Sequence, residues 1–174
     1  YAAQYDQLIF LEKDEVIIND VRFLGTTLWT NYLHELGIIE RDKNILILDD
    51  ALYDHKVIRH GNESFSALKA YEEHLVSERW LRERLMEPFD GKTVVITHHA
   101  PSFQCNHIDF GMNLYSPGFA SNLDVLVAMA DVWCYGHTHS NLDATFAGCR
   151  LLSNQAGYKN EKKPVPLEHK LIIL

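Results

Sequence analysis

The 174-residue chain has little cysteine, little positive charge and no long apolar run. Its three cysteines, Cys105, Cys134 and Cys149, form no Cys-x-x-Cys pair, which excludes a disulfide framework and favours a reducing, cytoplasmic compartment with buried thiols. No stretch approaches the roughly 18 apolar residues of a membrane span, and the first 20 residues are acidic rather than basic. We therefore expect neither a membrane partner nor an export signal.

Acidic residues outnumber basic ones, with 24 Asp and Glu against 16 Lys and Arg, which gives a net charge of −8. This balance argues against a nucleic-acid polymer as partner, because affinity for such polymers depends on Lys and Arg. A small anionic substrate would then need local positive charge, such as metal ions. With 47% hydrophobic residues the chain has enough apolar surface for a core, and we expect residues 1–174 to form a single domain.

The hydrophobic pattern predicts an α/β protein. A stripe of apolar residues at steps of three or four predicts a helix over about 65–85, and residues 31–43 are ambiguous, with a helix as one option. A shorter helix is expected at 123–130. The expected strands are 8–11, 16–18, 21–25 after an Asn19-Asp20 turn, 45–48, 93–97, 131–135, 144–146, 150–152 and 170–174, with a loop over 159–166.

Two histidine clusters follow two of these strands. The strand at 93–97 runs into His98 and His99, and the strand at 131–135 runs into Gly136-His137-Thr138-His139. A strand, a crossover helix and a strand make two parallel neighbours whose carboxyl ends lie at one edge, where open α/β sheets bind ligands. We expect the two clusters to meet there.

Three of these imidazoles suit a borderline divalent cation such as Zn, Mn or Fe. In extended backbone, His137 and His139 would point to the same side, and Gly136 would allow the chain to turn sharply away from the strand. His98 would join them from the neighbouring strand. The alternative is that these histidines are ordinary hydrogen-bonded loop residues.

Four segments resemble known sequence patterns. Residues 94–102 (VVITHHAPS) and 133–139 (WCYGHTH) resemble the last two signature blocks of the calcineurin-like metallophosphoesterases. Residues 21–29 and 153–158 look like segments of a phosphohydrolase branch of that family. The resemblance implies the C-terminal half of a four-layer αββα sandwich, with two divalent metal ions (Mn, Fe, Zn or Ni) that hydrolyse phosphate esters through a metal-activated hydroxide.

The same resemblance assigns roles to individual residues. His98 and His137 would bind one metal and His139 the other. His99 is not a ligand in the family pattern, but it would lie close enough to touch the substrate or a bridging solvent, and it is our candidate for a catalytic role. Asn154 and Tyr158 would line the substrate rim.

The family's first three blocks, Asp-x-His, Gly-Asp-x-x-Asp and Gly-Asn-His-Asp/Glu, do not occur in this sequence. Asp54-His55 lacks the intervening residue, and Gly61-Asn62-Glu63 is better explained as the cap of the following helix. Two cations about 3.5 to 4 Å apart need carboxylates to hold them. We therefore expect the sequence to be the C-terminal portion of a longer enzyme, with Tyr1 a cut end, and to bind metal weakly and catalyse little on its own.

The remaining histidines have weaker claims. His107 lies in the loop after His99, and such a loop at a ligand edge often contacts substrate. We expect the others to be surface or hydrogen-bonded side chains: His34, His55, His60, His74 and His169.

Three functions stay open at this point. The first is a dinuclear phosphoesterase. The second is a non-catalytic binding or scaffolding module on the same fold, and the third is a mononuclear zinc hydrolase that uses only the three histidines. The substrate, the choice between monoester and diester, and the oligomeric state do not follow from the sequence.

Overall fold

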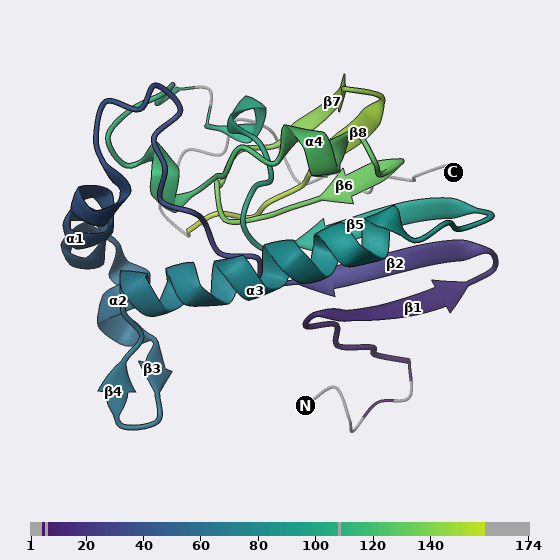
Figure 1. Cartoon of the computed structure of the whole chain (residues 1–174), viewed down its shortest axis with the longest axis horizontal. Coiled ribbons are helices and arrows are strands. Elements are labelled where there is room, and N and C mark those ends of the chain that lie inside the picture. The colour runs from purple at the N-terminus through teal and green to yellow at the C-terminus, as the bar shows by residue number, and fades with distance from the viewer. Residues whose placement is uncertain (1–4, 6, 108, 159–174) are drawn as a thin grey trace.

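The computed structural model describes residue 5, residues 7–107 and residues 109–158, and contains one six-stranded sheet in the order β1-β2-β5-β6-β8-β7 (Figure 1). The inner strands β2, β5, β6 and β8 pair in parallel, and each edge is closed by an antiparallel hairpin. The strands are β1 (Asp14–Ile18), β2 (Val21–Thr26), β5 (Lys92–Thr97), β6 (Val132–Cys134), β7 (Leu142–Phe146) and β8 (Cys149–Ser153). The α/β prediction is confirmed.

Helices cover one face of this sheet and extend beyond its carboxyl edge. In Figure 1 the long helix α3 (Ala67–Met86) crosses in front of the sheet, and α1 and α2 lie past the arrowheads of β2 and β5. The other elements are α1 (Arg41–Ala51), α2 (Tyr53–Val57), α4 (Asp124–Val127), the 3-10 turns η2 (Phe103–Cys105) and η3 (Ser116–Gly118), and a small hairpin of β3 (Arg59–His60) and β4 (Glu63–Ser64). None of the helices in the described part of the chain is long and apolar enough to cross a membrane.

Most of the predicted elements are present. The β1–β2 hairpin turns at Asn19 and Asp20, whose φ values of 49° and 61° place both in the left-handed region that Asn and Asp tolerate. The helix α3 and the strands β5 to β8 also match their expected ranges. All three cysteines are free, and Cys105 and Cys149 are buried as expected. The predicted strand at 170–174, the loop at 159–166 and His169 lie outside the described residues.

The predicted strand at 45–48 is wrong, because these residues lie inside helix α1. Ile45 and Leu48 are buried on one side of the helix while Leu46 between them is 73% exposed. A run of four apolar residues fits a strand or a helix equally well by pattern alone. The contact of α1 with the start of α3 selects the helix, in a second apolar cluster formed by Tyr32, Ile45, Leu48, Phe65, Ala67 and Ala70.

Two further predictions are corrected. Residues 8–11 pair with no strand, and Leu11 instead packs so closely on Gly25 that a side chain there would find no room. Gly61 and Asn62 form the turn of the β3–β4 hairpin and do not cap a helix. The cap of α3 is Ser66, whose hydroxyl accepts a hydrogen bond from the Lys69 backbone N–H at 3.2 Å.

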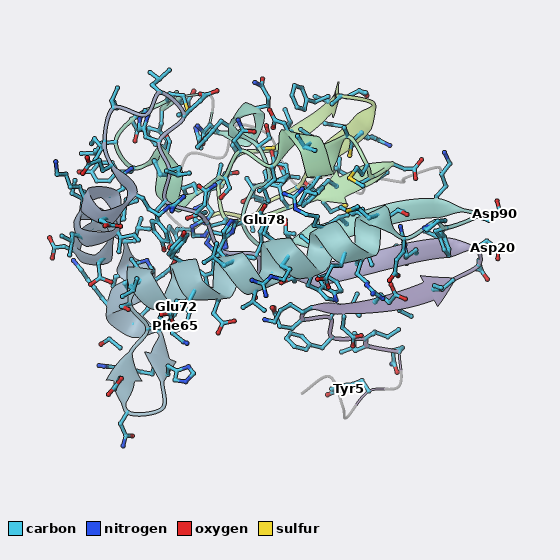
Figure 2. The ribbon with its side chains drawn as sticks, in the orientation of Figure 1. Tyr5, Asp20, Phe65, Glu72, Glu78 and Asp90 are labelled. Atoms are coloured by element: carbon cyan, nitrogen blue, oxygen red, sulfur yellow. The ribbon has the colours of Figure 1, made fainter. Side chains whose placement is uncertain are left out.

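The sheet has two unlike ends. Figure 2 shows Asp20 and Asp90 at the end where β2 and β5 begin, far from α1 and α2. At the opposite end the parallel strands stop beneath α1, α2 and the long loop after β5. The strand register places His98 and His99, which follow β5, beside the residues that follow β6.

Candidate active site

The two histidine clusters meet at the carboxyl ends of β5 and β6, as predicted. The Gly136 N–H donates to the His98 carbonyl at 3.0 Å, which joins the two loops. The ring centroids are 4.9 Å apart for His98 and His137, 5.0 Å for His98 and His99, and 4.2 Å for His99 and His137. Three imidazoles from two adjacent strands therefore share one small volume.

The backbone between the histidines differs from the prediction. His137 and His139 are not extended, since both have left-handed φ values of 66° and 53°. Gly136 is not among the residues with positive φ, so the sharp turn is made by the histidines themselves. A left-handed conformation costs a residue other than glycine roughly 1 kcal/mol, and such strain collects at functional sites. The packing around this loop holds it in place.

Gln155, which the sequence analysis did not single out, stabilises this loop. Its Oε1 accepts from the His139 backbone N–H at 2.8 Å, and its Nε2 donates to the Thr138 hydroxyl and the Ser140 carbonyl, each at 2.9 Å. Three hydrogen bonds from one side chain fix residues 138–140. The signal that could have identified Gln155 is its position, as a polar residue just after β8 in the segment 153–158.

His99 lies behind the other two rings and is only 1% exposed. Its ring Nδ1 is 3.3 Å from the Thr27 carbonyl, and Trp29 packs on its face with centroids 4.8 Å apart. Burial lowers the pKa of His99 well below its usual value, so the ring is neutral. His99 therefore packs against the rings of His98 and His137 on their buried side.

His137 is the least satisfied group of the cluster. Its ring stacks on Phe119 at 4.9 Å, and its side chain is 12% exposed, yet Nε2 is buried with no hydrogen-bond partner. Burial, with the neighbouring His98 and His139 next in importance, lowers the pKa of His137 to about 3. Burial likewise lowers the pKa of His98. Both rings are thus neutral near pH 7, which leaves a nitrogen lone pair free for a ligand.

Asp54 brings a carboxylate to the histidines, although the sequence analysis excluded it on spacing. Its Oδ2 lies 3.9 Å from His137 Nε2, and its charge also acts on His98. The neighbouring residue explains its position: His55 is buried, with its ring nitrogens 3.1 Å from the Tyr32 hydroxyl and 2.9 Å from the Phe65 carbonyl. The contacts of His55 hold α2 against the protein interior, and this places the neighbouring Asp54 carboxylate beside His137. Only the tertiary packing of α2 reveals this proximity.

The cluster opens into a cavity of about 1060 Å³. His98, His137 and His139 line it, together with two of the predicted substrate contacts, His107 and Tyr158. The Tyr158 ring meets His139 edge to face at 4.7 Å, and the half-buried His107 ring packs on Phe110 at 4.5 Å. Asn154 is exposed and is not part of this lining, and His99 lies outside it as well.

The donor groups of the histidine cluster suit a metal ion in type but not in placement. Neutral imidazoles, an unpartnered buried nitrogen on His137 and a nearby carboxylate on Asp54 are ligands that a divalent cation accepts. As placed, however, no three His, Cys, Asp or Glu side chains among the described residues are arranged to hold one ion. The donor types therefore suit a divalent cation although their placement does not form a ready-made site, and a pair of cations would also need bridging carboxylates, for which the described residues offer Asp54 beside His137.

The other described histidines behave as expected. His55 and His74 are buried and hydrogen-bonded, the latter through Nδ1 at 3.1 Å from the Leu28 carbonyl. His34 Nδ1 accepts from the Leu36 backbone N–H at 3.2 Å, and His60 is exposed in β3.

Comparison with known proteins supports the fold. No family model matches the chain. An uncharacterised protein of Acanthamoeba polyphaga mimivirus is 21% identical over 173 residues, covering 91% of this chain and 58% of the viral protein. The crystal structure of phosphopantetheinyl hydrolase from Mycobacterium tuberculosis is similar with a TM-score of 0.58 and 14% identity, over 86% of this chain and 58% of that one. The chain thus spans a little over half the length of either protein, and the structural likeness, at this low identity, establishes a shared fold.

Proposed function

We propose that this chain contributes to a metal-dependent phosphoesterase of the calcineurin-like type. The observation that carries the proposal is the convergence of His98 and His137 at adjacent strand ends, with His139 on the same cavity wall. The hydrolase named by the structural comparison agrees with a hydrolytic role. From composition we also propose that residues 1–174 form a single domain and that the protein is cytoplasmic.

In this proposal His98, His137 and His139 hold the divalent ions, and Asp54 supplies negative charge beside them. When bound, such ions activate water and neutralise charge on the phosphate oxygens. The water oxygen forms a bond to phosphorus, the ester bond to the alcohol breaks, and the alcohol leaves with a proton. His99 acts as a positioning residue, because its contacts with Thr27 and Trp29 support the rings above it.

The test uses the native gene product, assayed on p-nitrophenyl phosphate with Mn, Fe, Zn or Ni and analysed for metal content. We expect hydrolysis that a chelator abolishes, with two metal ions per chain. One zinc per chain would favour the mononuclear hydrolase instead. If none of the four metals supports hydrolysis of any phosphate ester, the proposal fails, and the absence of a ready-made metal cluster among the described residues would then favour a binding module.

A further inference from the structure

The cavity above the histidines is larger than a phosphate group requires. Its volume of about 1060 Å³ slightly exceeds the roughly 300–1000 Å³ found for pockets that bury drug-sized molecules. The histidines occupy one part of its wall. Much of the rest is built by α1, α2 and the described residues of the loop between 106 and 119, none of which holds the three proposed histidine ligands. A substrate that fills this space must carry a sizeable group besides the phosphate.

Aromatic side chains form much of the wall away from the strand ends. Tyr53 from α2 is 68% exposed, Phe110 and Tyr115 from the long loop are 70% and 49% exposed, and Tyr158 after β8 is 64% exposed. Large aromatic residues left in contact with solvent gain by covering a ligand's apolar or flat surface. That three separate segments bring them to one cavity indicates an organic group as their target.

The charge of the wall restricts that group further. Among the described lining residues, the carboxylates of Asp50, Asp54 and Asp109 outnumber the one cationic side chain, Lys56. Charges of like sign repel, here most strongly at the half-buried Asp54 and less at the exposed Asp50 and Asp109, so a second phosphate or carboxylate on the substrate would be disfavoured away from the histidines. Aromatic faces, by contrast, attract cations and accept uncharged rings equally well.

We propose that the substrate is a phosphate ester that carries, besides the alcohol it releases, a bulky organic arm without further negative charge, bound on the aromatic wall by Phe110 and Tyr115. This inference rests on the proposed function for the chemical step. Water attacks phosphorus, the bond to one ester oxygen breaks and the alcohol takes up a proton, while the arm stays on the wall and positions the phosphorus at the histidines.

Three chromogenic esters with the same leaving group test the proposal on the native gene product with Mn. They are methyl p-nitrophenyl phosphate, whose methyl group is too small to act as an arm, p-nitrophenyl phosphorylcholine, with a cationic arm, and the p-nitrophenyl ester of thymidine 5′-monophosphate, with a flat uncharged arm. All three are diesters that release p-nitrophenol, and we expect KM to be about tenfold lower for the two esters with arms. The double variant Phe110→Ala, Tyr115→Ala should remove that advantage and leave KM for methyl p-nitrophenyl phosphate unchanged. Leu46→Ala, exposed on α1 outside the cavity, is the matched control.

Ligand binding separates this inference from the proposed function. By calorimetry, phosphocholine and thymidine 5′-monophosphate should bind more tightly than inorganic phosphate, and phosphoglycolate, whose arm is anionic, more weakly than phosphocholine. The double variant should lose these differences. If no ester is hydrolysed but the binding pattern holds, the phosphoesterase proposal falls and the arm site stands. Equal affinities for all ligands, or a pattern that the double variant preserves, would overturn the arm site.

Discussion

The two ends of the parallel strands are built from opposite principles. Where the strands begin, the buried Arg22 donates to the Arg84 carbonyl at 2.9 Å and to the Thr93 hydroxyl at 3.1 Å, and its guanidinium lies over Phe89. Asp131 accepts from Lys92 Nζ and from the Thr93 N–H, each at 2.8 Å. Where the strands end, His137 and His139 have left-handed backbones and His137 Nε2 has no partner.

This difference distinguishes an end of the sheet whose contacts stabilise the fold from the end that we propose to be functional. Arg22 and Asp131 are charges whose partners belong to the same chain, so their contacts stabilise the fold. His98, His99 and His137 are crowded together, burial lowers the pKa of each ring, and His137 Nε2 lacks a hydrogen-bond partner, which costs stability unless a ligand completes the site. Substitutions at the two ends should therefore act on different measurements.

The largest expected effect is on activity, at the carboxyl end. We expect His137→Ala to lower the rate of p-nitrophenyl phosphate hydrolysis by the native gene product at least about 100-fold, because it removes a proposed metal ligand. His60→Ala, on the exposed β3 hairpin, is the control and should be neutral. A His137→Ala protein with normal activity would contradict the proposed functional role of the carboxyl end of the sheet.

At the opposite end the effect should be on stability. Arg22→Ala leaves the Arg84 carbonyl and the Thr93 hydroxyl without their donor, and we expect the free energy of unfolding in urea to fall by about 2–3 kcal/mol. Lys43→Ala, 70% exposed on α1, should change it by less than about 0.5 kcal/mol. Activity at saturating substrate should be unaffected in the folded Arg22→Ala protein. A loss of turnover without a loss of stability would contradict the division.

Asp54 tests whether the carboxylate beside His137 belongs to the functional end. Asp54→Asn keeps the size of the side chain but removes its charge, and we expect the metal dissociation constant measured by calorimetry to rise about tenfold. The free energy of unfolding of the metal-free protein should hardly change. Asp50→Asn, on the same cavity wall but in α1, provides the comparison. Equal effects from the two variants would show that Asp54 acts only through the general charge of the cavity.

The smallest effect concerns Glu78, on α3 next to the buried His74. Its Oε2 is 3.5 Å from His74 Nε2, and its Oε1 accepts a hydrogen bond from Arg82 at 2.8 Å. The interaction with His74, larger than the opposing effect of burial, and the interaction with Arg82 lower the pKa of Glu78 to about 2. A carboxyl whose pKa falls on folding stabilises the protein above its ordinary pKa and loses that contribution as pH falls toward 2. We expect wild type to exceed Glu78→Gln in unfolding free energy by about 1–2 kcal/mol at pH 6, a value reduced for its partial exposure.

Urea titrations of both proteins between pH 6 and pH 2 measure that difference. It should shrink steadily below about pH 4.5, where the carboxylate begins to be protonated in the unfolded chain but not yet in the folded protein. A difference independent of pH would mean that Glu78 acts through packing rather than charge.

Some of the fold and site followed from local pattern because local physics is decisive there. The apolar spacing over 65–85 correctly predicts the helix α3, although its buried face also contains His74 and Ser77 while Leu68 and Leu75 are exposed. The strand β5 is an almost continuous β-branched run, so neighbouring residues already select its conformation. For residues 45–48 and 8–11 the local pattern predicted strands that the structure does not contain. The former are apolar enough for either state, and contact with α3 selects the helix, while the latter find no strand to pair with.

The residue pattern alone predicted that His98 and the Gly136–His139 segment lie at one edge of a parallel sheet, because strand order and polarity follow from a strand, helix, strand pattern. Which other groups join them depends on packing between distant parts of the chain. Asp54 reaches His137 because the buried His55 anchors α2, Gln155 holds the histidine loop, and the aromatic wall is assembled from α2, the loop after β5 and the segment after β8. These contacts join residues distant in the chain, and their spacing carries no periodic signal from which they could be predicted.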